Sequence, residues 1–251
     1  MALFKSGNPT LSPKVFENTT VTDYSNVMTL RGTLNKFGFM LLMLLGTAYY
    51  SWKEFANGGD VTPLIWIGMI GGFITAIIIT FKKEWAPYLA PFYGLMEGLF
   101  LGAVSAAFNA AFAAKAPNII INAVGLTFGT AIAMYLLYTF KIIRATQKFK
   151  AVIITATMGI AIFYLITIVI GFFGVHLDFM SNSFPLSIGI SLFVVAIAAL
   201  NLILDFDMVE QGSAAGAPKY MEWYCAFGLM VTIVWLYLEI LRLLAKLSDR
   251  R

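Results

Sequence analysis

The chain has 251 residues and a net charge of +4, and 60% of its residues are apolar whereas only 12% are Asp, Glu, Lys or Arg. Soluble domains carry about 25% charged residues, so a water-soluble protein of this composition would expose large apolar patches. The composition therefore excludes soluble, disordered and coiled-coil proteins and predicts an integral membrane protein. One Cys and one His also exclude an internal disulfide and a usual zinc site.

Seven apolar segments follow a polar N-terminal tail at 1–36. A helix needs about 20 apolar residues to cross a bilayer, and the continuous apolar runs are typical of helices rather than barrel strands. The segments are 37–52, 63–81, 88–113, 119–140, 151–175, 184–204 and 221–244. The sequence thus predicts an all-α membrane protein, with a seven-transmembrane helix domain over 37–245 and a basic tail at 246–251.

Lys and Arg are more frequent in the connections on the N-terminal side of the predicted membrane, which favours an N-terminus inside the cell. After seven crossings the basic C-terminal tail would lie outside, against this rule. A re-entrant last segment with both termini inside is the alternative. These basic connections account for the net charge, so the charge does not indicate a nucleic-acid partner.

Glu97 lies within the third apolar segment, beside glycines at 94, 98 and 102. Ionisable residues within spans are costly, roughly 2.5–3.5 kcal/mol at the membrane centre, and therefore mark candidate functional sites. Glycines at four-residue spacing form a smooth strip on which another helix can pack closely. Glu97 is expected to face protein, either as a protonated acid bonded to a backbone carbonyl or as a proton or cation ligand.

Three acids close the sixth segment: Asp205, Asp207 and Glu210. Residues two apart on a helix point about 200° from each other, so at most one of Asp205 and Asp207 faces a given partner helix. Their apolar neighbours favour burial of these two, whereas Glu210 is expected to be a solvated acid at the membrane surface. Asn201 is expected on the same face as Asp205, one turn earlier.

The chain contains no nucleophile–base arrangement, phosphate-binding loop or HExxH motif, so the sequence does not indicate an enzyme. Four stretches resemble the Bax inhibitor-1/YccA-like family, in its bacterial subgroup. They are EGLFLG at 97–102, KIIRATQKF at 141–149, FDMVEQG at 206–212 and LRLL at 241–244. Their order and spacing cover nearly everything after the N-terminal tail.

The resemblance implies a bundle in which six helices surround a central seventh, and a proton-sensitive calcium leak across the membrane. It also implies that an aspartate closing the sixth span shares a proton with an aspartate in the seventh. Asp207 matches the first position, whereas the second falls on Thr232, which is not acidic. Asp207 would then pair with Glu97 or Asp205, or act alone, and Asp205 is expected to face away from the bundle axis.

The resemblance further implies a basic residue at the inner end of the second span, where Lys82 and Lys83 stand. The leading function is therefore a pH-sensitive cation leak channel, with calcium as the transported ion, Asp207 and Glu97 as its ligands and no bound cofactor. The alternative is a regulator that transports nothing and binds a membrane protease or another membrane protein. The N-terminal tail and the glycine strip would serve such contacts, and the bacterial resemblance implies the cytoplasmic inner membrane.

Overall fold

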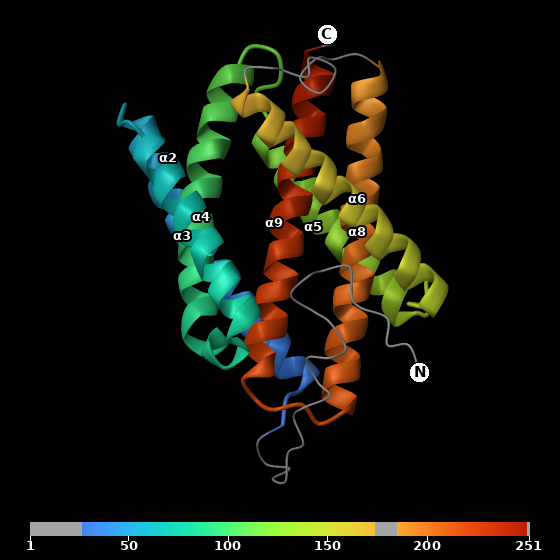
Figure 1. Ribbon diagram of the computed structural model, residues 1–251. Helices are drawn as coiled ribbons and strands as arrows, with labels where there is room; N and C mark the ends of the chain where they lie inside the picture. Colours follow the sequence, from blue (N-terminus) through green and yellow to red (C-terminus); the bar gives the residue numbers. More distant parts are fainter. Residues whose placement is uncertain (1–26, 174–184, 250–251) are drawn as a thin grey trace.

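The computed structural model describes residues 27–173 and 185–249, and in these ranges the chain is helical throughout apart from turns and one isolated β-bridge (Figure 1). The elements are α2 (Leu30–Ala56), α3 (Thr62–Phe81), the 3-10 turn η2 (Lys83–Trp85), α4 (Ala86–Phe112), α5 (Ile119–Thr139), α6 (Gln147–Phe172), α8 (Pro185–Ala214) and α9 (Met221–Ser248). Most of the predicted tail, at 1–26, and the span ends at 174–175 and 184 lie outside the described residues, as do 250–251.

Six of the described helices are long and apolar enough to cross a membrane, namely α3, α4, α5, α6, α8 and α9. By the length and apolarity of its helices, the prediction of a multi-pass helical membrane protein is confirmed. α2 has 27 residues but does not reach the same apolarity, so the seventh crossing stays a prediction. α8 continues to Ala214, beyond the apolar segment that ends at 204. The residues after 204 are more polar, but they remain helical.

α9 is the central helix of the bundle. It packs against α2, α4, α5 and α8, and in Figure 1 it runs in red between the α2–α4 group and the α5–α8 group. α3 packs on α4, and α6 packs on α8. The side chains of Phe227 and Leu236 on α9 are fully buried, and the ring of Tyr93 meets that of Phe227 edge-on at 4.8 Å. This arrangement agrees with the expected central position of the last helix.

α2 and α4 are in backbone contact along the glycine strip, which comprises Gly94, Gly98 and Gly102. A Cβ added at Gly98 would lie 2.0 Å from the Thr47 hydroxyl oxygen, and one at Gly102 would lie 2.3 Å from a carbonyl oxygen of α2. The close approach lets Thr47 and Ser51 donate hydrogen bonds of 2.9 and 3.0 Å to carbonyls of α4. The glycine strip is therefore covered by α2, and it does not offer the free surface for a partner protein that we expected.

Candidate functional site

The carboxyl group of Asp205 lies in the core of the bundle, at the contact between α8 and α9. Its side chain is fully buried, and the Thr232 hydroxyl donates a 2.5 Å hydrogen bond to Asp205 Oδ2. The same hydroxyl lies 3.3 Å from the carbonyl oxygen of Gly228, one turn earlier on α9. An acid on one helix and a hydroxyl on the central helix thus meet in the buried core.

The expected facing of the two aspartates is wrong and has to be reversed. Asp205, rather than Asp207, faces α9, and Asp207 turns to α6, where Lys150 pairs with it and the Gln211 side chain donates to the same carboxylate oxygen. Helical spacing fixed the angle between the two side chains correctly, since they point to different helices. It could not determine which of them faced the bundle axis, because that depends on how α8 is rotated.

Asn201 extends the polar contact at Asp205 toward α6. Its amide nitrogen donates hydrogen bonds of 2.8 Å to the Thr157 hydroxyl and of 2.8 Å to the carbonyl of Ile197. In the part of the chain that the structure describes, Asn201 Oδ1 is a buried acceptor with no hydrogen-bond partner. A buried acceptor without a donor is unfavourable by about 1–3 kcal/mol, so this oxygen is suited to accept from a water or to ligate a cation.

Glu97 belongs to a different contact. It is half-buried, and a Cβ added at Gly72 of α3 would lie 3.0 Å from Glu97 Oε1, so the carboxyl group sits between α3 and α4. Asp207 contacts α6 instead, and no group of three His, Cys, Asp or Glu residues suited to a metal forms among the described residues. The contacts of Asp207 and Glu97 thus lie on different helices and give no support to a calcium site shared by the two.

The remaining predicted residues lie at the end of the bundle where α3 ends and α9 begins. Glu210 is exposed and accepts a hydrogen bond from the Tyr138 hydroxyl, as expected of a surface acid. Lys82 is exposed, whereas the Lys83 ammonium lies 5.8 Å from the ring centre of Tyr224 on α9. Of the two lysines that fit the basic position expected at the end of the second span, Lys83 is therefore the one that reaches the central helix.

Sequence reasoning missed another buried carboxyl group, that of Glu222 in the first turn of α9. It accepts hydrogen bonds from the backbone nitrogen and the hydroxyl of Thr29 at 2.9 and 3.0 Å. Lys36 of α2 and Lys219 also pair with it, the latter at 2.9 Å. The available signal was an acid at the start of a span three residues after a lysine, a position where a helix N-terminus favours negative charge.

Comparison with known proteins agrees with this architecture. A family model described as Bax inhibitor 1 like matches residues 8–249, which is nearly the whole chain. No curated protein matches the chain at a significant level.

Proposed function

Because the chain belongs to the Bax inhibitor 1-like family, we propose that this multi-pass membrane protein is a pH-sensitive cation leak channel, with calcium as its ion. The observation that carries the proposal is the hydrogen bond from Thr232 to the fully buried Asp205. We assign the pH-sensing role to Asp205 rather than to Asp207. Asp207 is half-buried and already has Lys150 as its counter-ion, so a change in its charge does not act on the central helix directly.

The mechanism follows from the cost of a buried charge. A protonated Asp205 is neutral and keeps the α8–α9 contact dry. When it loses its proton, a negative charge lies in the buried core, and burial of a charge is unfavourable unless water or a cation reaches it. Deprotonation is therefore expected to favour a looser packing of α8 on α9, and the leak is expected to rise with pH. Asn201 Oδ1, one turn from Asp205, adds a second oxygen for an entering cation.

Calcium flux into dye-loaded vesicles tests the proposal. Wild-type protein is expected to leak more as the pH rises from about 5 to 8. Asp205→Asn keeps the shape and cannot ionise, so its flux should stay at the low-pH level throughout. Asp207→Asn is the matched control, and its flux should still depend on pH. The leak is refuted if vesicles with protein take up no more calcium than empty ones at every pH, and the sensor is reassigned if only Asp207→Asn flattens the profile.

We further propose that the N-terminus faces the cytoplasm of a bacterial cell. The support is the excess of Lys and Arg in the connections on that side, including the stretch at 141–150 between α5 and α6.

A further inference from the structure

A cavity of about 730 Å³ opens at the end of the bundle where α5 and α8 end and α2 begins. Leu34 of α2, Tyr138 of α5 and Glu210 of α8 are among its walls, and Leu229 of α9 also lines it. Small-molecule sites usually measure about 300–1,000 Å³, so the cavity is large enough for a ligand or a lipid headgroup. The proposed leak mechanism does not use it.

The charges of the cavity favour an anion. Lys141 and Arg144, from the connection between α5 and α6, line it, and neither has an ion-pair partner among the described residues. The two acids in its wall are already engaged, since Asp207 pairs with Lys150 and Glu210 accepts from Tyr138. Lys141 and Arg144 are therefore the charged groups of the cavity wall that remain available to bind a ligand.

The connection that supplies these cations also carries exposed apolar side chains. Phe140 is 70% exposed and Ile142 is 69% exposed, and they flank Lys141. Apolar and basic side chains that alternate in this way are typical of segments at an anionic membrane surface. The anion that meets the cavity is therefore expected to belong to a lipid.

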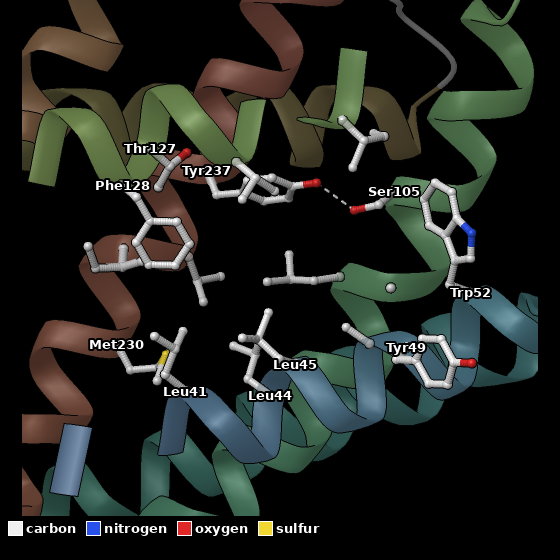
Figure 2. Close-up of a pocket in the computed structure, with 17 residues that line it drawn as sticks. Leu41, Leu44, Leu45, Tyr49, Trp52, Ser105, Thr127, Phe128, Met230 and Tyr237 are labelled. Carbon is white, nitrogen blue, oxygen red and sulfur yellow. Dashed lines mark hydrogen bonds between the residues drawn. The ribbon is translucent and has the colours of Figure 1, made fainter. Parts of the chain in front are cut away.

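A second cavity, of about 250 Å³, lies farther along the same helices and is almost wholly apolar (Figure 2). Leu41 and Leu45 of α2, Phe128 of α5 and Met230 of α9 surround it, and the hydroxyls of Ser105 and Tyr237 bond each other at 2.6 Å. Leu229 lines the charged cavity and the next residue of α9, Met230, lines this one. The charged and the apolar cavity thus follow one another along α9, between α2 and α5.

We propose that this pair of cavities binds one anionic phospholipid, with its phosphate at Lys141 and Arg144 and an acyl chain directed along α9 toward the apolar cavity. The occupant is a lipid with a glycerol headgroup, such as phosphatidylglycerol. Its phosphate carries the negative charge that the two cations need, and its hydroxyls can donate to the carboxylate of Glu210. The lipid enters from the leaflet on which the cavity with Lys141 and Arg144 opens.

Native mass spectrometry of the full-length protein, titrated with phosphatidylglycerol or phosphatidylcholine, tests the site. Phosphatidylglycerol should bind as a single tight adduct, and phosphatidylcholine should bind at least about tenfold more weakly. Two lost cations near an anionic headgroup should cost roughly 30-fold in affinity, so Lys141→Gln with Arg144→Gln should weaken the adduct by about that factor. Lys82→Gln with Lys148→Gln removes two exposed lysines outside the cavity wall and should leave the affinity within about twofold.

A second variant separates the cavity from general surface charge. Leu34→Trp fills the charged cavity from the α2 side and keeps every cation, so it should also weaken phosphatidylglycerol binding by at least about tenfold. The proposal is overturned if the two double variants lose affinity equally, if Leu34→Trp binds like wild type, or if inorganic phosphate displaces the lipid. Binding and flux are measured separately, so a failure here leaves the proposed leak untouched.

Discussion

Position 232 holds a hydroxyl group where the family resemblance implies a second carboxyl group. Thr232 already bonds Asp205, so Thr232→Asp would place two carboxyls within hydrogen-bond distance in the core. Two such groups share one proton and titrate as a pair. We expect this variant to make the calcium flux depend more steeply on pH than in wild type, with Thr232→Asn as the control that cannot ionise. An unchanged slope in Thr232→Asp would show that the pair does not control the leak.

Among the acidic residues, Glu222 is expected to be the one whose substitution lowers the stability of the protein most. Glu222→Gln keeps the shape but leaves Lys36 and Lys219 without their counter-ion, and we expect a loss of about 2–3 kcal/mol in the free energy of unfolding. Thermal unfolding in detergent, followed by size-exclusion chromatography, measures the effect. Glu84→Gln, at an exposed acid of the same end of the bundle, should unfold at the wild-type temperature. Equal unfolding temperatures for both variants would contradict a role of Glu222 in holding α2 to α9.

The sequence predicted which residues of the candidate site are unusual, but it did not predict their partners. Asp205 and Asp207 stood out because acids near the end of an apolar segment are costly, and their opposed directions follow from helix geometry. The rotation of α8 about its axis depends on packing against α6 and α9, which no local pattern encodes. The pair of Asn201 and Asp205, one turn apart, was the signal that this face is buried, since both side chains point into the core.

At the scale of helices, two glycine-to-alanine substitutions, one in the glycine strip and one outside it, are expected to change stability in opposite directions. Gly98→Ala would place a Cβ 2.0 Å from the Thr47 hydroxyl and 2.2 Å from the carbonyl oxygen of Leu44, so we expect a loss of about 1–3 kcal/mol. Gly125→Ala on α5 meets nothing within 4 Å and should stabilise by about 0.5–1 kcal/mol, because alanine favours the helix. The unfolding temperatures of the two variants should move in opposite directions. A stabilising effect of Gly98→Ala would show that α2 does not pack closely against α4 at this position.

Helix positions were predicted best where the helix does not extend beyond its apolar run by a polar turn. The segment predicted at 119–140 is α5 (Ile119–Thr139), and that at 63–81 is α3 (Thr62–Phe81). The ends of α2, α6 and α8 were predicted less well, because polar turns extend these helices beyond their apolar parts. An apolar run marks the part of a helix that can lie in the lipid. The ends of a helix depend instead on caps such as Thr29, whose hydroxyl accepts a 3.0 Å hydrogen bond from the backbone nitrogen of Gly32.

At the scale of the whole molecule, the crossing by α2 and the orientation can be tested together. Single cysteines at Arg31, Asn57 or Lys148, in a Cys225→Ala background, report which side each residue faces. If α2 crosses and the N-terminus lies inside, an impermeant thiol reagent should label only the Asn57 position in intact cells. The other two positions should react after permeabilisation. Labelling of Arg31 and Asn57 from the same side would show that α2 does not cross, and labelling of Lys148 in intact cells would reverse the orientation.

The contact between Thr29 and Glu222 joins residues that are 193 positions apart in the chain. During synthesis α2 emerges early and α9 last. The start of α2 therefore cannot form its contact with the Glu222 carboxylate until the chain is nearly complete. A chain that stops before residue 222 retains the packing of α2 on α4 but lacks the anion that pairs with Lys36 and the indole of Trp223 beneath the Lys36 ammonium. The contact thereby distinguishes finished from truncated molecules, and cellular proteolysis is expected to remove the truncated ones first.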